Sequence, residues 1–153
     1  MTDPRQRQEL GILLFVANRA LEQRAFDAVV AAGITDITLA QARIAARIAP
    51  DGSRVSDLAE QARVTKQSAA SLVEQLEKAG YVERVADPTD GRARLVRLTP
   101  KLQRVGRVAD AEVARVLAEW ADHVGAARLR QLHETLHDLR AIIDPNGAVG
   151  QAP

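Results

Sequence analysis

The chain contains no cysteine, few aromatic residues and almost no net charge. The absence of cysteine excludes disulfide bonds, thiolate metal sites and thiol-based redox sensing. Aromatic residues make up 3% of the 153 residues, so the core must be built from aliphatic side chains and alanine, which favours helices over sheets. The net charge is +1, so no global basic field indicates a nucleic-acid partner. Any argument for DNA binding must therefore rest on where the charges lie.

Long apolar runs are missing as well. The longest, residues 12–17, is far too short to cross a bilayer, and neither a basic segment nor a small-residue cleavage site marks it as a signal peptide. We therefore expect a cytoplasmic protein without a membrane partner. The 46% of apolar residues suffices for the core of an ordinary folded domain.

The most informative stretch, residues 64–80, has the start, the apolar face and the end of a helix. Thr65 is suited to the N-cap, and Gly80 to the left-handed position beyond the last turn. Apolar residues recur every three or four positions, which predicts one buried face: Ala69, Leu72, Val73, Leu76 and Ala79.

The first turn of this helix, predicted over residues 66–79, carries polar and positive side chains that can donate hydrogen bonds. Such groups at the positive end of a helix dipole suit entry into the major groove of DNA. Gln suits adenine, Lys suits guanine, and Ser serves either a base or a phosphate. The candidate contacts are Thr65, Lys66, Gln67, Ser68 and Ser71. In an isolated helix, plain solvated first-turn residues would be the better interpretation.

The flanking segments favour DNA binding. A helix opened by Thr38 is expected over residues 39–48, and a short helix over 56–62 follows a brief strand at Arg54-Val55. Two short helices joined by a tight turn describe a helix-turn-helix. Strand-like residues 81–85 and 94–98 enclose the turn-forming residues 87–91 and predict a β-hairpin wing.

Long amphipathic helices are expected at both ends of the chain. The first covers residues 6–32, the second starts at Thr99-Pro100 and reaches about residue 123, and the third covers 126–143. The third has leucines at alternating three- and four-residue spacing, which is typical of a packed bundle. One copy of the chain can hardly bury all these apolar stripes, so we expect a dimer.

The predicted fold is mainly α with a small β-hairpin wing (α+β). Residues 38–100 would form a winged helix-turn-helix DNA-binding domain, 6–32 and 101–143 a helical dimerisation region, and 144–153 a loose tail.

These residues resemble the MarR family of bacterial winged-helix transcription regulators. The resemblance covers residues 6–143, and its most specific part, residues 90–99, is similar to the wing signature of that family. Residues 64–68 and 76–82 are similar to its recognition helix. One departure is Leu102, which follows Lys101 where the family often has glycine.

The resemblance implies a homodimer whose two winged lobes straddle a palindromic operator in double-stranded DNA. Arg92 would lie at the tip of the wing, residues 87–94, and reach into the minor groove, held by a salt bridge from Asp90. Arg94 stands at the same hairpin tip and is a further candidate for contact with DNA. Arg54 and Arg84 are second-tier candidates for contacts with DNA phosphates. The family also implies a small-molecule effector that binds between the long helices and the winged lobe. We expect a repressor that such a ligand relieves.

Two other functions stay open. A winged-helix module for protein contacts, without sequence-specific DNA binding, is the alternative, although the arginines at the wing tip argue against it. An enzyme finds little support, because the chain has no recognisable nucleophile motif or phosphate-binding glycine loop and implies no cofactor. His133 and His137, four residues apart, could present two imidazoles to a metal, as in some zinc-sensing relatives, but no third ligand is evident and surface histidines are the preferred interpretation.

Overall fold

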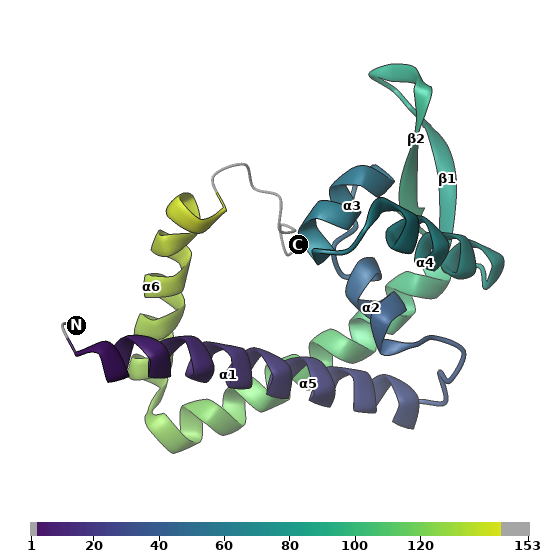
Figure 1. Ribbon diagram of the computed structural model, residues 1–153. Coiled ribbons are helices and arrows are strands. Elements are labelled where there is room, and N and C mark those ends of the chain that lie inside the picture. The colour runs from purple at the N-terminus through teal and green to yellow at the C-terminus, as the bar shows by residue number, and fades with distance from the viewer. Residues whose placement is uncertain (1–2, 145–153) are drawn as a thin grey trace.

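The computed structural model describes residues 3–144, which form six helices and a two-stranded sheet (Figure 1). This architecture confirms the predicted fold class. In chain order the elements are α1 (Pro4–Ala31), α2 (Leu39–Ala45), α3 (Val55–Ala62), α4 (Lys66–Lys78), β1 (Val82–Asp87), β2 (Asp90–Leu98), α5 (Pro100–Val124) and α6 (Ala126–Ile143).

Local capping signals explain most of the helix ends. Thr38 and Gln41 form a reciprocal capping box at the start of α2. The Thr65 side chain accepts a hydrogen bond from the Ser68 N–H at 3.1 Å and so caps α4 as predicted. Gly125 has φ +92° and separates α5 from α6. Thr99 occupies the N-cap of α5, but its hydroxyl donates to the Gly80 carbonyl oxygen at 2.7 Å instead of capping the helix.

The core lies inside the lobe formed by α2, α3, α4 and the base of the hairpin. Ile44, Leu58, Val73, Leu76 and Tyr81 are each at most 1% exposed. Leu102 and Val105 of α5 join the same cluster, so the start of α5 is part of the lobe. This packing fixes the orientation of α4, whose predicted apolar face is buried at Ala69, Val73 and Leu76.

The hairpin is longer than the sequence suggested, because β1 and β2 pair from Val82–Leu98 outward to Asp87–Asp90. The predicted strand at Arg54-Val55 is wrong: Arg54 occupies the N-cap of α3, Val55 begins the helix, and a single bridge joins Ser53 to Val96. Gly52 permits this bridge, since its φ is +101° and a Cβ there would lie 3.0 Å from Leu95 Cβ.

The second helix is also shorter than expected. It ends at Ala45 instead of residue 48, and Ile48 closes the segment with a hydrogen bond from its N–H to the Ala45 carbonyl. The tail predicted over 144–153 falls outside the described residues apart from Asp144. Among residues 3–144, no helix has the length and apolarity needed to cross a membrane.

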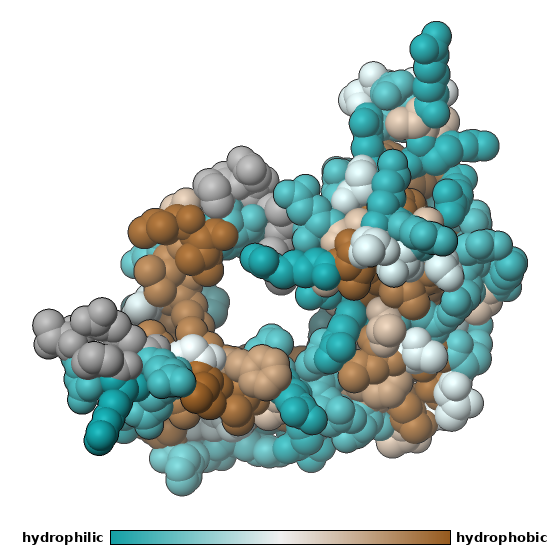
Figure 2. All heavy atoms as spheres, viewed as in Figure 1, coloured by the Kyte–Doolittle hydropathy of each residue, from teal (hydrophilic) through white to brown (hydrophobic). Residues whose placement is uncertain are grey.

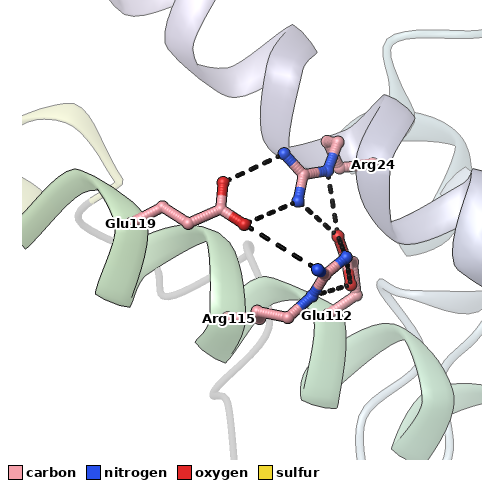
Figure 3. Close-up of polar contacts among 4 residues, drawn as sticks. All are labelled: Arg24, Glu112, Arg115 and Glu119. Carbon is pink, nitrogen blue, oxygen red and sulfur yellow. Dashed lines mark hydrogen bonds and ion pairs between the residues drawn. The ribbon is translucent and has the colours of Figure 1, made fainter.

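The long helices α1 and α5 cross beneath the lobe and are joined by a charged cluster (Figures 1 and 3). Glu112 of α5 is 8% exposed and receives hydrogen bonds from Arg24 of α1 and Arg115, at 2.9 and 2.8 Å. Arg24 also donates to Glu119 at 3.0 Å. The Arg115 guanidinium lowers the pKa of Glu112, and Arg24 lowers that of Glu119. The buried carboxylate is therefore paired and fixes the crossing of α1 and α5.

Helix α6 turns away from the end of α5 and buries none of its residues. Leu132, Leu136 and Leu139 are 48%, 38% and 42% exposed, so their seam has no partner within the described chain. The N-terminal half of α1 is similarly uncovered, with Phe15 63% exposed. Figure 2 shows apolar surface on both helices. The expectation that α6 packs in a bundle is thus not met within one copy.

Candidate nucleic-acid interface

The first turn of α4 presents the polar side chains selected from the sequence. Thr65, Lys66, Gln67, Ser68 and Ser71 are all exposed. The Thr65 hydroxyl contacts Ser68 Oγ at 2.8 Å, and Ser71 Oγ accepts from Gln75 Nε2 at 3.4 Å. Neither Lys66 nor Gln67 has a side-chain hydrogen bond or ion pair among the described residues. Their donors and acceptors are therefore available to bases or phosphates.

The other end of α4 is held by Lys101 of α5. Its ammonium donates to the Ala79 carbonyl oxygen at 2.8 Å and to Asp36 Oδ2 at 2.9 Å. It also lies 4.0 Å from the centre of the Tyr81 ring, and the Tyr81 hydroxyl donates to the other oxygen of Asp36. A cation at a helix C-terminus is favourable, because the last carbonyls carry partial negative charge.

These contacts displace the pKa values of all three ionisable groups. The Tyr81 hydrogen bond, followed by that of Lys101, lowers the pKa of Asp36. The Asp36 hydrogen bond raises the pKa of Lys101. Burial, followed by the hydrogen bond to Asp36, raises the pKa of Tyr81. The raised pKa values keep Lys101 charged and Tyr81 protonated to a higher pH than usual, which preserves the cluster.

The wing presents Arg92 and Arg94 at its outer end. Ala86 pairs with Arg94 and Asp87 with Asp90, so residues 91–93 of β2 have no partner on β1. Arg92 therefore projects from an irregular part of the hairpin. Neither Arg92 nor Arg94 has a side-chain hydrogen bond or ion pair in the described chain.

The salt bridge expected between Asp90 and Arg92 is not formed. Asp90 Oδ1 accepts from the backbone N–H of Arg92 at 3.1 Å, while its other oxygen lies 3.7 Å from the Arg54 guanidinium. The reason is geometric, because Arg54 at the start of α3 reaches the base of the wing turn. Asp90 thus orients the backbone of the wing tip and leaves the Arg92 side chain free.

Asp87 is the anchor of the wing, a role that the sequence did not indicate. It is 6% exposed, and its carboxylate accepts from the Thr89 hydroxyl and N–H at 2.7 and 2.8 Å. Arg54 donates to the opposite oxygen at 2.6 and 3.1 Å. The Thr89 bonds, followed by that of Arg54, lower the pKa of Asp87 to about 2. The Asp-Pro-Thr-Asp turn was visible in the sequence, but its partner Arg54 was not.

The second-tier phosphate candidates are both engaged. Arg54 is bound to Asp87, although its side chain is 42% exposed. Arg84 Nε donates to Glu77 at 3.1 Å and links the hairpin to the last turns of α4. Arg54 therefore holds the wing turn against α3, Arg84 holds the hairpin against α4, and each has donors left over for a phosphate.

A cavity of about 790 Å³ lies between α1, α2 and α5. Its walls are mainly apolar, with Phe26 and Val29 from α1 and Val105 and Val113 from α5. Two arginines without ion pairs in the described chain border it, Arg97 at the end of β2 and Arg107 on α5, and so does the unpaired carboxylate of Asp110. The cavity can therefore accept an apolar molecule, and the two arginines could hold an anionic group on it.

The two histidines of α6 lie side by side on the surface. The ring centres of His133 and His137 are 6.3 Å apart, and both residues are exposed. Within residues 3–144, no cluster of three or more His, Asp or Glu side chains is arranged to hold a metal ion.

The sequence of the lobe matches a known family. Residues 35–93 match the model of the MarR family. This lobe is therefore a MarR family domain. This assignment confirms the resemblance noted in the sequence, and the match spans α2, α3, α4 and most of the hairpin.

Comparisons along more of the chain agree. The transcriptional activatory protein BadR of Rhodopseudomonas palustris is 30% identical over 106 residues, which cover 66% of this chain and 59% of BadR. The chain thus spans less than two thirds of this relative. A MarR family structure from Bacillus stearothermophilus superposes with a TM-score of 0.70 at 21% identity, covering 94% of this chain and 99% of that chain. CouR of Rhodococcus jostii RHA1, solved with p-coumaroyl-CoA, gives a TM-score of 0.66 at 22% identity, covering 90% and 93%. At these identities, the solved structures establish a shared fold.

Proposed function

We propose that this MarR family member is a homodimeric DNA-binding transcription regulator. The observation that carries the proposal is the combination of free donors in one lobe. Lys66 and Gln67 are unengaged at the start of α4, and Arg92 is unengaged at the wing tip. A helix fits the major groove, and arginine is preferred in a narrow minor groove. The lobe thus has separate elements for base recognition and for backbone attraction.

The uncovered apolar surfaces support a homodimer. The exposed seam of α6 and the exposed N-terminal half of α1 lie away from the lobe (Figures 1 and 2). A second copy would cover both and would present two α4 helices with two-fold symmetry. Such a dimer reads a palindromic operator whose half-sites are about one helical turn of DNA apart.

The test is a titration of the purified protein with its own upstream DNA across salt concentrations, with random duplex as competitor. We expect selective binding by two protomers per site and a steep salt slope. Gln67→Ala should relax base preference, whereas Gln131→Ala on α6 should not. Arg92→Ala should weaken binding to all sequences and lower the salt slope by about one unit for each phosphate that the variant no longer binds.

Equal, weak binding to both duplexes would count against autoregulation. If a selection from genomic fragments then yielded no preferred site, the protein-contact module would replace this proposal.

We infer that the cavity between α1, α2 and α5 binds the effector. An apolar cavity with Arg97 and Arg107 at its border suits a hydrophobic acid or acyl thioester. CouR, which shares the fold, was solved with p-coumaroyl-CoA, so this compound is a reasonable first probe. Arg107→Gln should weaken its binding without changing DNA affinity in its absence. If Arg107→Gln bound p-coumaroyl-CoA as tightly as the native protein, the anionic group of the ligand would lie elsewhere.

A ligand that prefers a lobe spacing unsuited to DNA would release the dimer, which makes the protein a repressor relieved by its effector. A second candidate is activation, because the related BadR is named a transcriptional activatory protein. The same lobe serves both outcomes, since the position of the operator relative to the promoter decides between them. A promoter fusion measured with and without the regulator distinguishes them.

A further inference from the structure

The turn between α3 and α4 contains an arginine in a backbone conformation suited to glycine. Arg63 has φ +52° and ψ +44° at the end of α3, in the left-handed region. In residues 3–144, the other positions with positive φ are glycines: Gly33, Gly52, Gly80 and Gly125. A side chain in this region is strained, because its Cβ crowds the following carbonyl. The chain therefore accepts a steric cost here that it avoids at the other four positions.

The strained conformation is fixed by the backbone of the turn. The Arg63 N–H donates to the Glu60 carbonyl oxygen at 3.1 Å, and the Val64 N–H donates to that of Ala59 at 3.0 Å. These bonds close α3 and allow the chain to reach Thr65, the cap of α4, within two residues. The turn itself has no need of a guanidinium, because both bonds use main-chain atoms.

The Arg63 side chain is exposed and has no hydrogen bond or ion pair within the described residues. Three other arginines of the lobe are paired with acidic residues: Arg43 with Glu22, Arg54 with Asp87 and Arg84 with Glu77. Those without an acidic or main-chain partner in residues 3–144 include Arg63 and the wing arginines Arg92 and Arg94. Unpaired cations thus stand in the turn before α4 and at the end of the wing.

We propose that Arg63 binds a phosphate of the DNA backbone at the edge of the major groove that α4 enters. In a helix-turn-helix the first helix crosses the backbone and the second enters the groove, so the turn between them meets the groove edge. A guanidinium can hold a phosphate through two parallel hydrogen bonds. This inference rests on the proposed DNA-binding function and adds an interaction that fixes the depth and register of α4 in the groove.

Arg63→Gly separates this role from a structural one, because it removes the charge and the strain together. We expect a melting temperature equal to or above that of the native protein. DNA affinity should fall roughly tenfold for operator and random duplex alike. The slope of log K against log salt should decrease by about 0.9 for each phosphate that the variant no longer neutralises.

Two further variants complete the test. Arg63→Gln keeps the Cβ and its strain but removes the charge, and it should show the same reduction in salt slope. Arg63→Lys keeps the charge and should retain most of the slope. Arg19→Ala, which removes an exposed arginine of α1, serves as the control and should leave the slope unchanged.

A native salt slope in both Arg63→Gly and Arg63→Gln would overturn the inference while leaving the DNA-binding proposal intact. The native protein is measured first in the same assay. If it binds neither a selected operator nor random duplex, the proposed function fails and the role of Arg63 fails with it.

Discussion

Lys101 and Asp36, 65 positions apart in the sequence, form an ion pair of 2.9 Å that connects the start of α5 to the segment between α1 and α2. The same ammonium donates to the Ala79 carbonyl oxygen at the end of α4. One side chain therefore joins the end of α4 to α5 and to the segment between α1 and α2. A ligand in the cavity between α1, α2 and α5 would contact α5 as well, so Lys101 offers a mechanical link from that ligand to the proposed DNA-binding helix α4.

Lys101→Met tests this link, because it keeps most of the aliphatic side chain and removes the ammonium. We expect a modest fall in melting temperature and a clear loss of selective DNA binding as the end of α4 loosens. The matched control is Lys78→Met, which breaks an exposed pair with Glu74 of 2.8 Å. Such exposed pairs contribute little. Equal effects of the two substitutions on operator selectivity would refute the positioning role of Lys101.

Gly52→Ala should be the most damaging glycine substitution near the wing. The φ of +101° is unfavourable for alanine, and the new Cβ would lie 3.0 Å from both Leu95 Cβ and Arg97 Cγ. We expect a loss of about 2 kcal/mol or more in unfolding free energy, measured by urea denaturation. Gly106→Ala is the control, because that helical position has nothing within 4 Å of an added Cβ. This variant should have a free energy of unfolding about 0.5–1 kcal/mol higher than the native protein. A lower value would show that the space around position 106 is not free.

The elements that the sequence predicted well are those whose signals are local. Thr65 and Gly80 enclose α4, and the break at Gly125 separates α5 from α6, because capping and left-handed geometry depend on neighbouring residues. The errors occurred where tertiary contacts decide. Arg54-Val55 has the propensity of a strand, but the close approach of Gly52 to β2 leaves a single bridge at Ser53.

The sequence predicted the exposed hydrogen-bond donors of the candidate site. It did not predict the contacts that hold those donors in place. Lys66, Gln67 and Arg92 could be selected because helix and hairpin patterns predict which residues are exposed. The pairing of Asp87 with Arg54 joins residues 33 positions apart, and no sequence pattern connects them. The left-handed conformation of Arg63 was equally hidden, because glycine is the usual signal for it.

Asp87 should make wing stability dependent on pH in the acid range. Its pKa is about 2 in the folded protein, below the ordinary value of 3.8, because the carboxylate accepts from Thr89 and Arg54. A lowered folded-state pKa gives stability that is complete above about pH 4 and disappears as the pH falls toward 2. The difference in melting temperature between the native protein and Asp87→Asn should thus be largest above pH 4 and shrink toward pH 2.

Asp122→Asn is the control for this pH series, since Asp122 is exposed and has no ion pair in the described chain. Its difference from the native protein should stay near zero throughout. A constant difference for Asp87→Asn across the same range would mean that its carboxylate does not titrate as its hydrogen bonds require.

Leu136→Glu tests whether the seam of α6 is a dimer interface. Leu136 is 38% exposed in one copy, between Leu132 and Leu139, which are similarly uncovered. A carboxylate buried there by a second copy would lack a partner, so the dimer dissociation constant should rise by roughly 100-fold or more. Sedimentation velocity over a concentration series measures this change.

Gln131→Glu adds a carboxylate to the same helix outside the leucine seam and should leave the dimer intact. If both variants sediment like the native protein, the seam is not an interface. If Leu136→Glu is monomeric and still folded, its affinity for a palindromic operator should fall toward that for a single half-site, because the two α4 helices are no longer held at a fixed spacing. The exposed leucines of α6 would then contribute to operator recognition by holding two lobes together, although none of them touches DNA.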